Sequence, residues 1–442
     1  MTTRETAGPR KWQEEYQRKL TTPEEAVKVV KSGDTVVIPL GREPEALGFA
    51  LAARAGELRD IDLLVNAPGL DFGWYDPGWE ESFRVAVAYV FPRGVSREFM
   101  DARRGDFLIQ SVFGAPWDLP EEPTDVVMVE VSPPDRNGFC SFGTSLWDKR
   151  EQCARARVVL AEVNDRLIRT HGTNYVHVSE IDAFVEHSRS SGWGYHPPAP
   201  SEEVRTIARF VNELIRDGDT IQFGTGTISE ALPNAGALDG KNDLGLHTEM
   251  TARGLVRLVR EGAINGKRKT IHPGKAIATA LGGAREDVEF IHENPLFEAH
   301  SVHHVSHPRT ICQNDNMVAV NQALAIDLTG QVASESFGPR MWSGSGGQPA
   351  FAIGSLMAKN GRSIMVLPST AKGDTISRII PVHDAGTVIT VPRTAADVVI
   401  TEHGVARLRG RTIRERAEAL IAIAHPDHRA ELRRQARKLY WE

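Results

Sequence analysis

The stretch SEEVRTIARFVNELIRDGDTIQFGTG, residues 201–226, decides the fold class of this chain. Apolar residues recur in its first part at helical spacing, Gly-Asp-Thr then ends the helix, and an apolar run follows that is typical of a buried strand. A similar pattern, TTPEEAVKVVKSGDTVVIPLG, occurs at residues 21–41. Asp34 and Asp219 occupy the same place in the two stretches, 185 residues apart. The chain therefore repeats a helix–strand unit.

Two further pairs of segments extend this repeat. RDIDLLVN corresponds to NDLGLHTE, which pairs Asn66 with Glu249. VVMVEVSPPDRNGFCSFG resembles MVAVNQALAIDLTGQVASESFG, with Asp135 against Asp327. Both halves alternate helical patterns with short strands rich in valine and isoleucine. We therefore predict an α/β fold of two related open α/β domains with largely parallel sheets, produced by internal duplication.

A segment rich in serine, glycine and proline separates the two halves. It reads SRSSGWGYHPPAPSEE and spans residues 188–203, a composition typical of a domain boundary. We predict an N-terminal domain at residues 1–192 and a C-terminal domain at residues 193–442. Ligands of open α/β sheets bind at the carboxyl ends of strands. Because Asn66 stands in the first half where Glu249 stands in the second, any chemistry should reside in the second half.

Bulk properties argue against several classes of protein. The chain has 442 residues, of which 41% are hydrophobic and 25% charged, as in an ordinary globular enzyme. A formal net charge of −6 argues against a nucleic-acid binder driven by overall charge. The three cysteines form no CxxC pair, which suits a reducing compartment and no thiolate zinc site. No apolar run reaches about 18 residues and the N-terminus lacks the apolar core of a secretion signal, so we expect a cytoplasmic protein without membrane spans.

Three loops that follow strands are candidates for ligand contact. GTGTISEA, residues 224–231, is either a tight structural turn or a loop whose backbone amides hold an anion or a carbonyl oxygen. It lacks the third glycine of a dinucleotide fingerprint. WSGSGGQPAF, residues 342–351, is either a flexible loop or backbone packed close to a ligand. PSTAKGD, residues 368–374, brings Lys372 to a strand end with serine and threonine, which would suit a phosphate or pantetheine.

Two other motifs are weaker. GAINGK resembles a P-loop but lacks its spacing and its Ser or Thr. HSVHHVSH supplies His300, His303, His304 and His307 at helical spacing, which would suit zinc. Because no acidic partner of these histidines is apparent and Pro308 follows at once, we expect surface or pocket-wall histidines and no metal site.

Glu249 lies at the end of an apolar strand, in the segment LGLHTEM. The residue is a surface charge, a metal ligand, a general base or a nucleophile, and the segment alone does not separate these roles. Two glycine loops at strand ends and a Ser/Thr/Lys turn occur in the same half. The sequence contains no convincing metal site or catalytic triad that would offer an alternative to Glu249. This combination favours a functional role.

LGLHTEM also resembles the nucleophile motif of the class I coenzyme A transferases. The resemblance is to the acetyl-CoA hydrolase/transferase family and, within it, to 4-hydroxybutyrate and butyryl-CoA:acetate CoA-transferases. It covers nearly the whole chain, and its supporting segments include VEVSPPDRNGFCSFGTS, NDNMVAVNQALAIDLTGQV, GSGGQ and LPSTAKGDTISRI. These segments together are far more specific than any one glycine loop. The resemblance implies the CoA-transferase fold.

The resemblance also implies roles for individual residues. Glu249 would be the nucleophile that carries CoA as a glutamyl thioester, and Asn321 would lie near the reacting carbonyl. The family's two CoA-binding loops match Gly224, Thr225, Gly226, Thr227 and Ile228, and Gly344, Gly346, Gly347 and Gln348; Lys372 is a further candidate for CoA contact. No metal and no permanently bound cofactor are implied, since coenzyme A and acyl-CoA are substrates. The family further implies a homodimer or homotetramer.

The expected function is transfer of CoA between an acyl-CoA and a small carboxylic acid of the acetate, butyrate or 4-hydroxybutyrate type. The partners are therefore these substrates, with neither nucleic acid nor membrane. Departures from the family pattern leave the acyl group open, because Thr225, Thr227 and Ser229 make the first loop more polar and Ala350 replaces an acidic residue. The alternatives are an acyl-CoA hydrolase of the same fold and a non-catalytic CoA or metabolite sensor.

Overall fold

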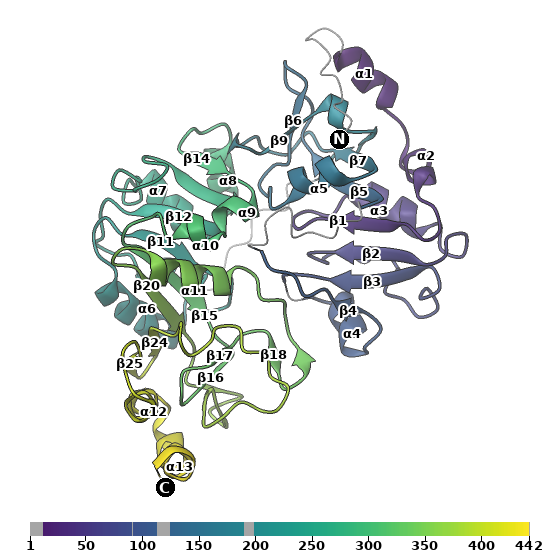
Figure 1. The fold of residues 1–442 in the computed structure, drawn as a ribbon. Helices are drawn as coiled ribbons and strands as arrows, with labels where there is room; N and C mark the ends of the chain where they lie inside the picture. The colour runs from purple at the N-terminus through teal and green to yellow at the C-terminus, as the bar shows by residue number, and fades with distance from the viewer. Residues whose placement is uncertain (1–11, 91, 113–123, 190–198, 442) are drawn as a thin grey trace.

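The computed structural model describes residues 12–90, 92–112, 124–189 and 199–441. These residues form two lobes, each built on its own large sheet (Figure 1). The expected boundary segment at residues 188–203 falls largely on residues 190–198, which lie outside the described residues. The division into residues 1–192 and 193–442 therefore stays a prediction.

The first lobe contains a seven-stranded sheet in the order β10-β7-β5-β1-β2-β3-β4, and all its neighbouring strands are parallel. Strands β1, β5 and β7 are largely buried on both faces, as in a parallel sheet covered by helices, whereas β2 and β3 each expose one charged residue. The strands are β1 (Thr35–Ile38), β2 (Ile61–Val65), β3 (Phe83–Val87), β4 (Asp106–Phe107), β5 (Val126–Val131), β7 (Val158–Val163) and β10 (Ala183–Glu186). The α-helices of this lobe are α1 (Trp12–Lys19), α2 (Pro23–Ala26), α3 (Glu45–Ala52), α4 (Val95–Asp101) and α5 (Lys149–Arg155).

The second lobe contains a nine-stranded sheet in the order β25-β24-β20-β15-β11-β12-β13-β14-β8, parallel except for the β24–β25 pair. Its strands are β11 (Thr220–Phe223), β12 (Gly245–Met250), β13 (Ala276–Ala280), β14 (Phe297–Ala299), β15 (Met317–Gln322), β20 (Arg362–Val366), β24 (Val398–Thr401) and β25 (Gly404–Arg407). The edge strand β8 (His171–Gly172) comes from the first half of the sequence and ties the lobes together. The expected fold class, two duplicated α/β units with largely parallel sheets, is confirmed.

Helices cover the second sheet (Figure 1), and further short strands pair within loops, antiparallel except for β16 with β23. The helices are α6 (Glu202–Leu214), α7 (Leu255–Arg260), α8 (Arg285–Ile291), α9 (Val302–Val305), α10 (Pro308–Ile311), α11 (Gln348–Met357), α12 (Ile413–Ala422) and α13 (Pro426–Ala436). The short strands are β6 (Phe139–Ser141), β9 (Tyr175–His177), β16 (Ala325–Asp327), β17 (Val332–Ala333), β18 (Ser336–Phe337), β19 (Arg340–Met341), β21 (Thr370–Ala371), β22 (Ile376–Ser377) and β23 (Ile379–Ile380).

The repeated Gly-Asp-Thr forms the same turn before the first strand of each sheet. Gly33 and Gly218 adopt φ values of 85° and 80°, a left-handed conformation that favours glycine. The next residue closes the turn, because its carboxylate accepts the backbone N–H three residues earlier, at 2.9 Å for Asp34 and 2.7 Å for Asp219. The local sequence thus fixes where each helix ends and each sheet begins.

Strand register confirms the correspondence between Asn66 and Glu249. Thr35 of β1 lies opposite Asp62 of β2, and Thr220 of β11 lies opposite Gly245 of β12. Counting four residues onward along β2 and β12 reaches Asn66 and Glu249. The two residues therefore hold the same place in the two sheets.

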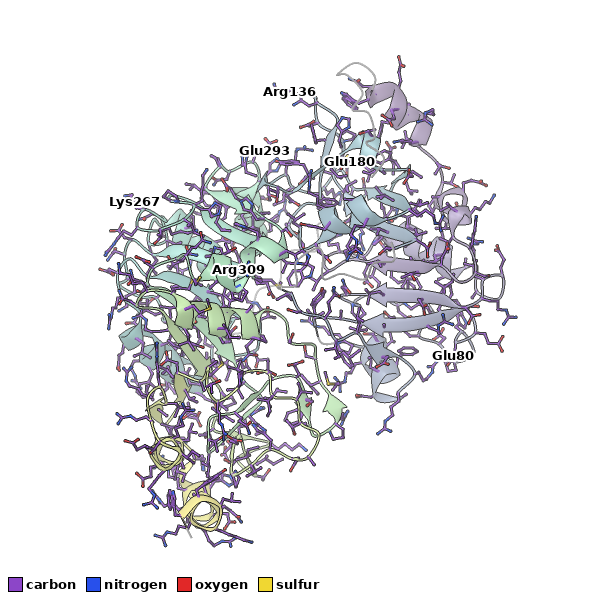
Figure 2. The ribbon with its side chains drawn as sticks, viewed as in Figure 1. Glu80, Arg136, Glu180, Lys267, Glu293 and Arg309 are labelled. Carbon is purple, nitrogen blue, oxygen red and sulfur yellow. The ribbon has the colours of Figure 1, made fainter. Side chains whose placement is uncertain are left out.

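The interior is apolar, and charged side chains gather at the outer edges of both lobes. Glu80, Arg136 and Lys267 are exposed there (Figure 2). One cluster of buried apolar side chains includes strands of both sheets, so the lobes share a core. Among the described residues, no helix combines the length and apolar composition needed to cross a lipid bilayer.

Candidate active site

A cavity of about 470 Å³ opens at the carboxyl ends of β11, β12 and β15, where an open α/β sheet binds ligands. Predicted site residues that line it are Gly224, Thr225, Gly226, Thr227, Glu249, Asn321, Gly344, Gly346, Gly347 and Gln348. Most of the predicted site therefore converges on one cavity. Ile228 and Lys372 are the exceptions.

Glu249 lies at the end of β12, half-buried, with its carboxylate in this cavity. Burial raises the pKa of Glu249 to about 7, and a hydrogen bond from the Ser306 hydroxyl to Oε2, at 3.2 Å, opposes that rise. No cationic side chain among the described residues forms an ion pair with this carboxylate. A carboxylate without a counter-ion keeps its lone pairs available for reaction.

The GSGGQ loop lies directly against the Glu249 carboxylate. A Cβ atom on Gly347 would lie 2.0 Å from Oε2 of Glu249, so any larger residue there would displace the carboxylate. Gly347 is also the N-cap of α11, whose N-terminal end therefore faces the carboxylate. A Cβ on Gly344 would meet the backbone of Tyr89 at 2.7 Å. The loop thus packs between the two halves of the molecule.

The GTGTI loop packs against the side chains that end β15. A Cβ on Gly224 would lie 2.3 Å from Oδ1 of Asn321. Ile228 is buried behind the loop, and its backbone N–H donates to Gln322 Oε1 at 2.8 Å. Ile228 therefore anchors the loop rather than lining the cavity.

Asn321 is held by a partner that the sequence did not reveal. Its side-chain amide donates to Gln222 Oε1 at 3.1 Å, and the amide of Gln222 donates back to Asn321 Oδ1 at 3.0 Å. One N–H of Asn321 is thereby occupied. The pair fixes the orientation of Asn321 at the cavity wall.

The cation in the cavity wall is Arg378. Lys372 is exposed on the turn between β21 and β22, with a φ of 51°, and does not line the cavity. Arg378 does line it, and its guanidinium donates to the carbonyl oxygens of Leu324 at 2.8 Å and Thr370 at 3.3 Å. Arg378 belongs to the family-like segment LPSTAKGDTISRI, so that segment held the signal that would have found it.

The first half contributes Tyr89 and Val90 to the cavity wall. Tyr89 is buried and adopts a φ of 58°, which is uncommon outside glycine, and its ring lies 5.5 Å from that of Trp147. A left-handed conformation at a non-glycine residue stores strain that the surrounding packing must hold. No motif in the sequence analysis pointed to this residue.

His247, two residues before Glu249, is fully buried, and its Nε2 lies 2.8 Å from the carbonyl oxygen of Val305. Burial lowers the pKa of His247 well below its ordinary value, so this histidine is neutral. It therefore links β12 to the end of α9 and adds no charge near Glu249.

The chain has clear relatives among known proteins. Residues 283–436 match the family profile described as the acetyl-CoA hydrolase/transferase C-terminal domain. The 4-hydroxybutyrate coenzyme A transferase of Clostridium kluyveri is 38% identical over 97% of this chain and 100% of its own length. The succinyl-CoA:cyclohexane-1-carboxylate CoA transferase of Geobacter metallireducens is 39% identical, over 97% and 98%.

A solved structure has the same fold over nearly its whole length. The 4-hydroxybutyrate CoA-transferase of Porphyromonas gingivalis superposes with a TM-score of 0.81 at 34% identity, covering 97% of this chain and 100% of that one. Sequence and fold therefore agree on the same group of relatives.

Proposed function

Since the chain belongs to the acetyl-CoA hydrolase/transferase family of coenzyme A transferases, we propose that it moves CoA between an acyl-CoA and a small carboxylic acid, with Glu249 as the covalent carrier. The observation that carries the proposal is the Glu249 carboxylate in the cavity, without a counter-ion among the described residues and against Gly347. An enzyme carboxylate is a natural relay between two carboxylic acids, because each exchange has the same chemistry in both directions.

The proposed reaction passes through two covalent intermediates on Glu249. Ionised Glu249 attacks the acyl-CoA thioester, which breaks the C–S bond and gives a mixed acyl-glutamyl anhydride and CoA thiolate. The thiolate attacks the glutamyl carbonyl, releasing the first acid as its carboxylate and leaving glutamyl-CoA. An incoming carboxylate then repeats these steps in reverse. This is covalent catalysis and predicts ping-pong kinetics.

Each attack develops negative charge on a carbonyl oxygen. Backbone N–H groups of residues 344–347 and the oriented amide of Asn321 are our candidates for stabilising it, since preorganised donors of this kind each contribute about 2.7–4 kcal/mol. The glycines of residues 224–226 leave room for the CoA thiol arm. Arg378 in the wall and Lys372 at the exposed turn would contact its polar groups.

The acid is a short monocarboxylate of the acetate, butyrate or 4-hydroxybutyrate type. Tyr89, Val90, Met250 and Phe351 give the cavity around Glu249 an apolar wall. Among the relatives, one is named for 4-hydroxybutyrate, and another is named for transfer from succinyl-CoA to cyclohexane-1-carboxylate, so its acceptor is also a monocarboxylic acid. A free carboxylate on the acid would need a cation beside Glu249, and Arg378, our candidate for CoA contact, already donates to two carbonyl oxygens.

The test is direct detection of the carrier. The chain is incubated with butyryl-CoA without acceptor, and the peptide that contains Glu249 is examined by mass spectrometry. We expect a CoA adduct on Glu249 that disappears when acetate is added and acetyl-CoA forms. An adduct on another residue would overturn the carrier, and CoA release that is independent of acetate would show a hydrolase instead.

A further inference from the structure

A second group of reactive side chains lies outside the cavity, at the end of β14. His272, Glu298 and His300 bring their nitrogen and oxygen ligand atoms within 4.8 Å of one another. His304 joins them, because its Nε2 lies 3.1 Å from Nε2 of His272. We call these four residues the histidine–glutamate cluster. The proposed transferase chemistry uses none of them.

Three segments of the chain build this cluster. Glu298 and His300 stand two residues apart at the end of β14, so both point to the same face of the sheet. His304 comes from α9, which packs on β12 and β13. His272 lies in the loop before β13 and adopts a φ of 50°. A positive φ at a histidine costs conformational energy, so the packing around this loop must hold the His272 backbone in place.

The distances among these side chains lie close to those between the ligand atoms of one metal ion. Zinc holds nitrogen ligands at about 2.0–2.1 Å in a tetrahedron, which puts ligand atoms about 3.3 Å apart. In the cluster, His300 Nε2 lies 2.9 Å from Glu298 Oε2, and His272 Nδ1 lies 4.0 Å from the same oxygen. His272 Nε2 and His304 Nε2 lie 3.1 Å apart, so without an ion one of the two rings donates a hydrogen bond to the other.

The surroundings also fit a metal site. Lys275 Nζ lies 3.5 Å from Oε1 of Glu298, which orients the carboxylate from outside as an outer partner would. The side chains of His300, Glu298 and His272 are 15%, 22% and 26% exposed, so an ion can reach them from solvent.

We propose that the histidine–glutamate cluster binds one divalent transition-metal ion of the zinc type. His272, Glu298 and His300 supply three ligands, and His304, whose Nε2 faces His272, supplies the fourth. Three imidazoles and one carboxylate in a tetrahedron are a donor set that zinc accepts. A metal site was not expected from the sequence because no acidic partner was apparent. The structure supplies that partner as Glu298, two residues before His300, and adds His272 from a distant loop.

The other histidines of the segment do not belong to this site. His303 and His307 line a shallow pocket with Glu151, Arg309 and His304, but neither belongs to the group formed by His272, Glu298 and His300. They are therefore matched controls, because they share the segment and the residue type but not the cluster.

A bound ion would stabilise residues of the proposed active site through α9. It would join the end of β14 to α9, and the Val305 carbonyl oxygen at the end of α9 accepts from His247 of β12. Ser306 follows and donates to Glu249. The ion would thus hold the Ser306 hydroxyl in place without touching the substrate.

The first measurement uses the full, untagged wild-type chain. The chain is stripped with a chelator, dialysed, and titrated with Zn²⁺ by calorimetry and with Co²⁺ by visible absorption. We expect one equivalent of Zn²⁺ per chain, a higher Tm, and the intense visible bands of tetrahedral Co²⁺. Binding well below one equivalent, or Co²⁺ bands of a six-coordinate hydrated ion, would overturn the proposal and leave a hydrogen-bonded cluster.

The second measurement uses variants. His300→Ala and His304→Ala should each weaken Zn²⁺ binding by more than about 100-fold, beyond the 10–100-fold effect of losing an outer partner, while His303→Ala and His307→Ala should leave it unchanged. Equal losses in all four variants, or none in any, would contradict the assigned ligands. The adduct on Glu249 should still form in the metal-free chain, so this result and the transferase test fail or succeed separately.

Discussion

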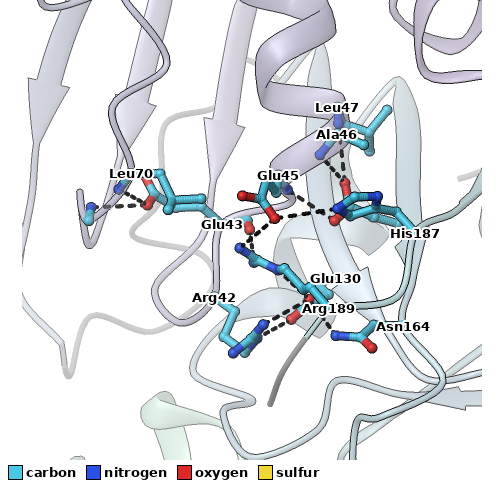
Figure 3. A network of polar contacts seen from close by, with 12 residues as sticks. Arg42, Glu43, Glu45, Ala46, Leu47, Leu70, Glu130, Asn164, His187 and Arg189 are labelled. Carbon is cyan, nitrogen blue, oxygen red and sulfur yellow. Dashed lines mark hydrogen bonds and ion pairs between the residues drawn. The ribbon is translucent and has the colours of Figure 1, made fainter. Parts of the chain in front are cut away.

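The seven strands of the first sheet have counterparts in the same order in the second sheet, but the side chains at the strand ends differ in charge. Register makes Arg42 the counterpart of Thr227, and Glu130 the counterpart of Gln322. In the first lobe Arg42 Nε donates to the Glu130 carboxylate at 2.6 Å (Figure 3). In the second lobe the equivalent contact is neutral, from Gln322 Nε2 to the Thr227 hydroxyl at 3.3 Å. The charged Arg42–Glu130 pair occupies the strand ends of the first lobe, whereas the uncharged Thr227–Gln322 pair of the second lobe borders the cavity.

Charged side chains fill the strand ends of the first lobe (Figure 3). Burial opposes ionisation of Glu130, but the hydrogen bond and charge of Arg42, with help from Arg189 and Asn164, lower its pKa. Glu162 accepts three backbone N–H groups at the start of α3, at 3.0, 2.7 and 3.2 Å. In the second lobe the equivalent strand ends carry the uncharged Thr227 and Gln322, and both line the cavity. We therefore infer a structural role for the strand ends of the first lobe, whereas those of the second lobe border the cavity.

Exchanging Glu249 for glutamine is the change with the largest expected effect. A carboxamide neither attacks the thioester nor carries CoA. We expect Glu249→Gln to lower kcat/KM for CoA transfer from butyryl-CoA to acetate by about 10⁴-fold or more, the scale of losing a covalent nucleophile. Steady-state assays of acetyl-CoA formation measure it.

The control moves the carboxylate to the other lobe. Asn66→Asp, combined with Glu249→Gln, restores an acid at the register-equivalent strand end. We expect no recovery, because Asn66 does not line the cavity that contains Glu249 and the GSGGQ loop. Near-normal turnover by Glu249→Gln alone would refute the difference between the lobes.

Gly347→Ala should have the next largest effect. Its Cβ would lie 2.0 Å from Oε2 of Glu249, so the carboxylate has to move. A displacement of about 1 Å at a reacting group costs about 10²-fold in rate, and we expect kcat to fall by that amount. Gly69→Ala is the matched control in the first lobe, because its Cβ would meet Glu43 Oε2 only at 3.5 Å. Equal effects of the two alanines on kcat would contradict the prediction.

Glu130→Gln tests the support role of the first lobe. The change removes the carboxylate that pairs with both Arg42 and Arg189, which are 18% and 17% exposed, although Arg189 keeps its ion pair with Glu45. Breaking a buried pair costs about 3–5 kcal/mol, and this partial exposure reduces the expected loss to about 2–4 kcal/mol of the free energy of unfolding. Gln322→Ala, its counterpart, should cost about 1 kcal/mol or less. Urea unfolding curves compare the two, and equal shifts would show that the lobes do not differ in this way.

The sequence predicted the repeat because the repeat is local. Each unit is a helix, a glycine turn and a strand, and these are signalled by residues close together in the chain. The pairing of Asn66 with Glu249 followed from counting along such units. The edge strand β8 was not predictable, because two residues of the first half join the second sheet only through tertiary packing.

The cavity was predictable only where family motifs lie. The glycine loops and Glu249 were found, whereas Ser306, Gln222, Tyr89 and Arg378 were not. Ser306 reaches Glu249 from 57 residues away, and Gln222 reaches Asn321 from 99 residues away. Such contacts depend on which strands become neighbours, and one sequence does not state that. The proposed contact of Lys372 with CoA stays a prediction.

The smallest expected effect is a shift in pH dependence. Burial raises the pKa of Glu249 to about 7. Because the attacking form is the carboxylate, kcat/KM should fall about tenfold per unit below pH 7 and level off above it. The Ser306 hydroxyl stabilises the carboxylate, so Ser306→Ala should move the midpoint upward by about one unit, within the strength of a hydrogen bond to a charge. A pH–rate profile with butyryl-CoA and acetate measures the shift.

The first lobe supplies the control for this titration. Burial also raises the pKa of Glu43 to about 7, against the opposing backbone N–H groups of Leu70 and Gly69. Its folded pKa lies above the unfolded value, so its contribution to stability is present below about pH 4.5 and is lost as the pH rises through 7. Glu43→Gln should therefore flatten the stability profile between these pH values and leave the midpoint of kcat/KM unchanged. If Glu43→Gln removed that midpoint while Ser306→Ala did not move it, the titrating group would lie in the first lobe, and the assignment of chemistry to the second lobe would be wrong.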